Sequence, residues 1–146
     1  MTNPRTEHVD VAACVFEALE AVIAQASEIK SCTYEHAPTD ALQLPCIIMQ
    51  TLGGDPVERR YLDGSCIAVY RFSLELRLIA EDDQGRLDAR ALLARIASEV
   101  ERAEIDLGAG RTPWGVSSDT LPSRIDSTEG HADWKTELTL KYQAHR

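Results

Sequence analysis

Residues 68–80 read AVYRFSLELRLIA, and this stretch decides the fold. Apolar and polar side chains alternate along it, which is the pattern of a β-strand with one face on a core and the other near solvent. Residues 134–142, WKTELTLKY, repeat the pattern. One-sided strands are typical of antiparallel sheets, and they argue against a doubly wound parallel sheet. The expected core face carries Ala68, Tyr70, Phe72, Leu74, Leu76, Leu78 and Ala80. The expected solvent face carries Arg71, Ser73, Glu75 and Arg77.

Two amphipathic segments predict helices. The first runs from about residue 7 to Ser27, with Thr6 as its candidate N-cap. The second begins at Glu81-Asp82-Asp83, with Asp83 as its candidate N-cap, and ends near residue 103 or 104. The expected core positions are Val11, Val15, Leu19, Val22, Ile23 and Ala26 in the first helix, and Leu87, Ala91, Leu92, Ile96, Val100 and Ala103 in the second.

Shorter segments complete the order of elements. Candidate strands cover residues 31–35, 46–52, 57–62 and 123–128, and Asp63-Gly64 predicts a hairpin turn. Residues 108–122 predict a loop because glycine and proline recur there. We therefore expect an α+β fold with a single antiparallel or mixed sheet of four to five strands, two helices on one face and the order α-β-β-β-α-β-β. The prediction is one domain over residues 1–146, with residues 1–6 as a flexible N-terminal tail.

Composition excludes several classes of partner. The 146 residues carry a formal net charge of −9. This acidic balance argues against nonspecific binding of nucleic acid and against attraction to anionic lipid. The N-terminus is polar, and no apolar run is long enough to cross a membrane, so we expect a protein that stays in a reducing cytoplasm.

No chemical motif stands out. Cys14, Cys32, Cys46 and Cys66 match no zinc spacing and are expected to be reduced and partly buried. The histidines, His8, His36, His131 and His145, form no metal-binding pattern. Residues 108–113 lack the spacing and the ending of a phosphate loop, and the carboxylates at 81–83 fit a helix N-terminus better than a cation site. We therefore predict no catalytic residue, no metal, no cofactor and no enzymatic activity.

The order of elements resembles that of bacteriophage tail terminator (tail completion) proteins, a group that includes minor tail and minor capsid proteins of prophages. The resemblance covers most of the chain. It rests on the first helix, the strand that opens at Leu44-Pro45, the charged hairpin 58–64, the long strand 69–76, the helix 87–103 and the final strands from Leu121 to Tyr142.

The resemblance implies a structural role in the phage virion, after assembly in the bacterial cytoplasm. It implies a homo-oligomeric ring, commonly of six subunits, on the head-proximal end of the tail tube. Such a ring stops tube growth and presents a surface to the head-completion or connector protein. DNA passes through the ring without specific binding, which an acidic lumen would favour.

Two exposed segments are the candidate interfaces: the hairpin around Arg59, Arg60 and Tyr61, and the loop around Arg111 and Trp114. Arginine and aromatic residues favour interfaces. Arg59 and Arg60 also fit solvated charges that protect an edge strand, and Trp114 also fits a lid over the core. The alternative function is a small ligand-binding or enzymatic domain with a pocket between sheet and helices, and a third is a regulatory or toxin–antitoxin partner domain.

Overall fold

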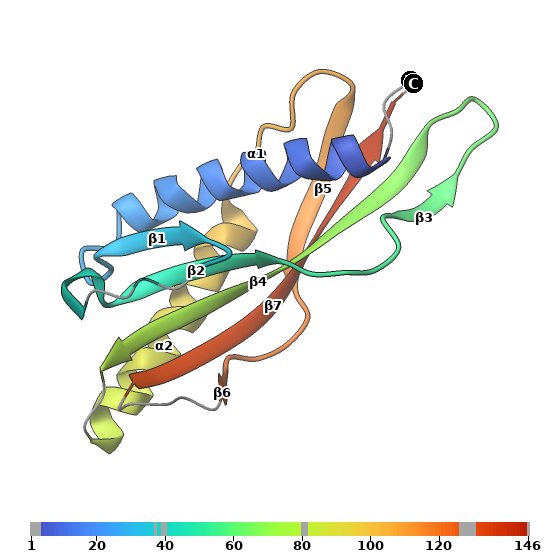
Figure 1. The fold of residues 1–146 in the computed structure, drawn as a ribbon. Helices are drawn as coiled ribbons and strands as arrows, with labels where there is room; N and C mark the ends of the chain where they lie inside the picture. The colour runs from blue at the N-terminus through green and yellow to red at the C-terminus, as the bar shows by residue number, and fades with distance from the viewer. Residues whose placement is uncertain (1–3, 37, 39–40, 80–81, 126–130, 146) are drawn as a thin grey trace.

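A computed structural model describes residues 4–36, 38, 41–79, 82–125 and 131–145 of the chain (Figure 1). These residues form an α+β fold with two α-helices, a short 3-10 helix and seven strands. The elements in chain order are α1 (Pro4–Ala24), β1 (Ser31–Tyr34), η1 (Ala41–Gln43), β2 (Cys46–Thr51), β3 (Val57–Arg60), β4 (Cys66–Ile79), α2 (Asp83–Arg102), β5 (Arg111–Ser118), β6 (Ser123–Ile125) and β7 (His131–Ala144). The predicted fold class is confirmed, with more strands than expected.

The sheet is built around two long antiparallel strands, β4 and β7. They pair along their whole length, from Cys66 opposite Ala144 to Ile79 opposite His131. The strand order is β1-β2-β4-β7-β5, with β3 beside the first residues of β4 and β6 beside the first half of β7. Only the β1–β2 pair among these strands is parallel, so the sheet is mixed.

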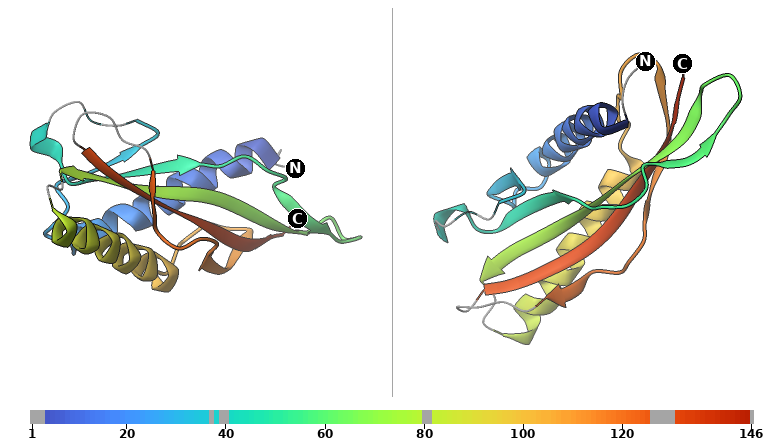
Figure 2. Two further views of the ribbon diagram at one scale, coloured as in Figure 1. Left: turned by 90° about the horizontal axis from the view of Figure 1, so that it is seen from below. Right: turned by 45° about the vertical axis from the view of Figure 1, so that its right-hand side comes forward.

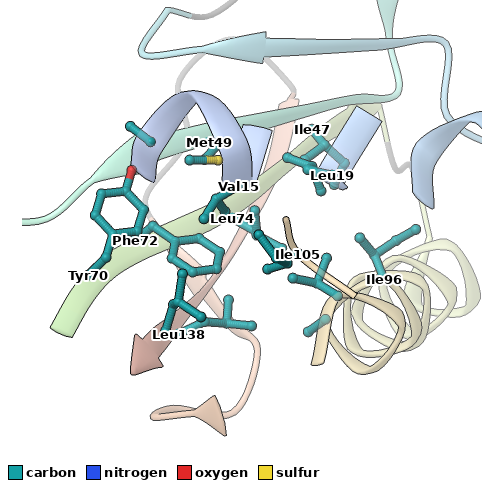
Figure 3. Packing of buried hydrophobic residues seen from close by; sticks show 14 of the residues in the cluster. Val15, Leu19, Ile47, Met49, Tyr70, Phe72, Leu74, Ile96, Ile105 and Leu138 are labelled. Atoms are coloured by element: carbon teal, nitrogen blue, oxygen red, sulfur yellow. The ribbon is translucent and has the colours of Figure 1, made fainter. Parts of the chain in front are cut away.

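Both helices cover the same face of the sheet (Figure 2). The predicted core face of β4 is confirmed, because Tyr70, Phe72, Leu74 and Leu76 are at most 1% exposed. Figure 3 shows how side chains from both helices and from β2, β4 and β7 meet in this core. Its labelled members are Val15, Leu19, Ile47, Met49, Tyr70, Phe72, Leu74, Ile96, Ile105 and Leu138.

The face of β4 that points away from the helices is more buried than its sequence predicts. Ser73 is fully buried, and its Oγ has no hydrogen-bond partner among the described residues. Arg77 Nε and Nη2 donate to the two carboxylate oxygens of Asp133, each at 3.0 Å, and Asp133 is only 3% exposed. Neighbouring strands account for the difference, because cross-strand pairs cover one another on this polar face.

The starts of both helices correct the sequence analysis. Helix α1 begins at Pro4, which suits proline because the first helical residue needs no donor; Thr6 lies inside the helix and is not its N-cap. Residues 1–3 of the expected N-terminal tail lie outside the described residues. In α2 the N-cap is Asp82 rather than Asp83, and its carboxylate accepts a hydrogen bond of 2.7 Å from Gly85 N.

The buried stripe of α2 also differs from the expected one. Ile96 and Val100 are buried as predicted, but Leu87 is 62% exposed and Ala91 is also exposed. Apolar residues occur on several sides of this helix, and packing selects the side that carries two alanines, which lets the helix lie close to the sheet. The buried residues are Ala89, Leu93, Ile96, Ala97 and Val100.

Strand β5 was missed, because residues 108–122 were expected to be a loop. It pairs with the second half of β7, and the register shifts between Pro113 and Gly115. Proline and glycine mark a break in a central strand but are tolerated at the edge of a sheet and at a bulge, which is where β5 lies. Of the expected strand 123–128, β6 covers Ser123–Ile125, while residues 126–130, which include the expected turn, lie outside the described residues.

Replacement of Phe72 by alanine tests the core assignment. Phe72 is fully buried between the sheet and the helices, so its truncation should lower the free energy of unfolding by about 3–5 kcal/mol. Leu42 is 80% exposed, and Leu42→Ala is the matched control, expected to change stability by less than about 0.5 kcal/mol. Urea unfolding measures both, and equal effects would contradict the assignment.

Glu75 gives a pH-dependent prediction. Burial is the main cause that raises the pKa of this carboxyl, followed by repulsion from Asp133. The folded state therefore disfavours the charged form, and stability falls as pH rises through and above the ordinary Glu range of about 4.3. Glu75→Gln should raise the unfolding temperature at neutral pH, and this gain should vanish below the ordinary range. A gain that is the same at acid and neutral pH would contradict the assigned cause.

Candidate interaction surfaces

A tight turn closes the hairpin between β3 and β4. Tyr61 N donates to Ser65 O at 2.9 Å, and Gly64 adopts a φ of 90°, a conformation that favours glycine. The Asp63 carboxylate accepts from both Ser65 N and Ser65 Oγ, at 2.9 and 2.6 Å, and these hydrogen bonds lower the pKa of Asp63. The predicted Asp-Gly hairpin is therefore confirmed, and its one acidic side chain is engaged within the turn.

We define the hairpin tip as Arg59, Arg60, Tyr61 and Leu62. All four side chains are exposed, and neither arginine forms an ion pair with a described residue. Tyr61 is 43% exposed and Leu62 is fully exposed. Sequence reasoning selected the first three as an interface and missed Leu62, although an apolar residue directly before an Asp-Gly turn was an available signal.

Arg111 and Trp114 play different roles in the structure. Arg111 was expected to be exposed, but it is half-buried, and its Nε donates to Leu107 O at 2.9 Å. It therefore ties the start of β5 to the segment that follows α2. Trp114, on β5, is 56% exposed, as an interface residue would be.

Two adjoining cavities lie at the C-terminal end of α2. The helix groove, about 640 Å³, runs between the C-terminal part of α1 and α2 and is lined by Ala18, Ala21, Val22, Gln25, Ala26, Glu28, Arg95, Ile96, Glu99, Arg102, Ala103 and Glu104. The Trp114 cavity, about 220 Å³, is lined by Ala103, Glu104, Ile105, Pro113, Trp114, Gly115, Val116 and Leu140. Because both contain Ala103 and Glu104, they form one continuous surface, here called the trough. Neither lies between the sheet and the helices, where a ligand pocket was the alternative expectation.

Ion pairs organise the charges around the helix groove. Arg95 Nη2 lies 2.5 Å from Glu28 Oε2 and joins the two sides of the groove. This hydrogen bond lowers the pKa of Glu28. Arg102 Nη2 lies 2.7 Å from Glu99 Oε1 on the same helix. Both arginines of the groove are thus paired, whereas Glu104 forms no ion pair with a described residue.

The residues considered for chemistry have structural roles. The carboxylates of Asp82 and Asp83 cap α2 and pair with Arg86, respectively. All four cysteines are free, and burial is the main cause that raises the pKa of Cys32 to about 12. Within the described ranges, no three His, Cys, Asp or Glu side chains gather as they would around a metal ion. Neither described helix has the length and apolar character of a membrane span.

Comparison with known proteins identifies the fold. Searches with this sequence find no matching protein family and no matching curated protein. The structure is similar to a chain from the virion of a native gene transfer agent (GTA) particle, with a TM-score of 0.60 and 15% sequence identity. The match covers 90% of this chain and 93% of the GTA chain. At this identity the likeness shows that the two chains share a fold over almost their whole length.

The two residues near the Trp114 cavity should respond differently to truncation. Arg111→Ala removes a partly buried hydrogen bond and should lower the free energy of unfolding by about 1 kcal/mol. Trp114→Ala removes a largely exposed side chain and should change it by less than about 0.5 kcal/mol. Chemical denaturation of both variants tests the distinction, and the reverse ranking would contradict it.

Proposed function

We propose that this chain is a structural protein of a phage or phage-like virion and that it acts as a tail terminator. The supporting observation is its fold, which is similar over 90% of the chain to that of a GTA virion chain. The resemblance in element order supports the same assignment. The proposal is non-enzymatic: the protein acts through its surfaces, in contact with other virion proteins.

Termination requires a particular asymmetry of surfaces. A tail tube grows because each head-to-tail contact leaves the next contact open. A ring with one face complementary to the last tube ring, and no copy of the growth face, ends the polymer. The opposite face is then available to a head-completion or connector protein. Since the chain carries a net charge of −9, its ring repels the phosphates of DNA that passes through it.

The ring proposal is compatible with the shape of the chain. The hairpin tip projects beyond the rest of the sheet (Figure 1), which suits contact with a neighbouring subunit. The interior between sheet and helices is filled by fully buried side chains such as Phe72 and Leu74, so the core favours a scaffold over a ligand-binding cavity. Arg59, Arg60, Tyr61 and Trp114 are the proposed contact residues, and Arg111 supports Trp114 from behind.

Tube length tests the function directly. The tail tube protein encoded beside this gene is polymerised alone and with added purified chain. We expect the added chain to shorten the tubes and to be found at one end only by gold labelling, because capping stops further addition. Tubes of unchanged length without label would contradict the terminator role.

The native mass tests the ring. Light scattering on a sizing column, over a range of concentrations, should show a discrete species near six times the chain mass of 16.1 kDa, either free or after release from tubes. An open series of sizes would contradict a closed ring, because a heterologous contact that does not close gives filaments.

A further inference from the structure

The hairpin tip carries positive charge that nothing in its own chain neutralises. Of the acidic side chains nearest to it, Glu58 is paired with Lys141 at 3.0 Å, and Asp63 is engaged by Ser65. Arg59 and Arg60 are therefore the charges that the tip presents to its surroundings. Beside them stand the exposed apolar side chains of Tyr61 and Leu62. The tip thus combines two guanidinium groups with two apolar anchors in a chain of strongly acidic composition.

The trough has the complementary character. Its floor is apolar and built from small or branched side chains, and Trp114 forms one end. Its rim carries three carboxylates against two guanidinium groups, and both guanidinium groups are already paired. Glu104, which belongs to both cavities, is the acid left over. The residues of the floor are Ala18, Ala21, Val22, Ala26, Ile96, Ala103, Ile105 and Val116.

The tip of a chain lies away from the groove of the same chain. The groove follows residues 18–28 at the C-terminal end of α1, whereas the tip projects past the N-terminal end of α1 (Figures 1 and 2). One subunit therefore offers a basic apolar projection at one end and an acidic apolar trough at another place. Two different patches of this kind make a heterologous contact, which repeats around a ring if the rotation closes.

We propose that the hairpin tip of one copy of this chain docks in the trough of the next copy. This inference rests on the proposed ring and assigns its subunit contact. Tyr61 and Leu62 fill the apolar floor, while Arg59 and Arg60 face Glu99 and Glu104 on the rim. The Trp114 ring lies at the end of the trough, where a guanidinium group can stack on its face. Two acidic chains repel one another elsewhere, so this contact also fixes their relative orientation.

A charge exchange tests the contact. The tip variant Arg59→Glu/Arg60→Glu changes the net charge from −9 to −13, and the trough variant Glu99→Arg/Glu104→Arg changes it from −9 to −5. Each variant alone places like charges together and should need at least about tenfold higher concentration to associate than the wild type. An equal mixture should regain association, because each altered patch then meets a complementary partner.

A matched control separates this contact from total charge. Arg90→Glu/Arg124→Glu makes the same change to −13 at exposed positions on α2 and β6, away from the tip, and should associate like the wild type. All variants should keep the wild-type unfolding temperature within a few degrees, since their side chains are exposed. Association is read as native mass, or as recovery with sedimented tail tubes where the free wild-type chain is monomeric.

The outcomes distinguish this inference from the function on which it rests. Loss of association in each variant, with recovery in the mixture and none lost in the control, supports the contact. If the wild type forms a ring and the tip variant forms it equally well, the contact is wrong and the ring stands. If variants lose association but their mixture does not regain it, the tip and the trough are not partners. A wild type that neither associates nor binds tubes contradicts both proposals.

Discussion

The pairing of β4 with β7 is the constraint on which the rest of the structure depends. Fourteen consecutive residue pairs, from Cys66–Ala144 to Ile79–His131, fix the register of the two central strands. Because side chains alternate along a strand, that register sends one set toward the helices and the other set away from them. A slip by one residue would carry Arg71 and Glu75 into the core. Every other strand then attaches to an edge that this pair provides, β2 and β3 to β4, and β5 and β6 to β7.

How far the sequence predicts this arrangement depends on how local each signal is. The core faces of β4 and β7 were predictable because alternation with period two has one interpretation over so long a stretch. Strand β5 was not, because Pro113 and Gly115 are breakers unless a neighbouring edge is already in place. The buried stripe of α2 was ambiguous for a different reason: leucines and alanines occupy several sides of this helix, and only contact with the sheet selects Leu93 over Leu87.

The same difference separates the candidate interface residues. Exposure of Arg59, Arg60 and Tyr61 follows from their place beside a tight turn, which is a local property. The partner of Arg111 is a backbone carbonyl that only the folded path of residues 107–111 brings near. The trough could not be found from sequence at all, since its floor joins α1 to residues that follow α2. Its alternating ion pairs are likewise set by the packing of the two helices and not by spacing along either one.

The edges of the sheet bear on how such a chain behaves before it meets its partners. At one edge, β1 has only four residues; at the other, β5 is interrupted by a bulge and by Pro113, which has no amide hydrogen to donate. Neither edge is a good template for backbone pairing with another chain. Newly made copies can therefore accumulate at high local concentration in a cell without joining into extended sheets. Contacts between copies are left to side chains, which can be remade until the correct neighbour is found.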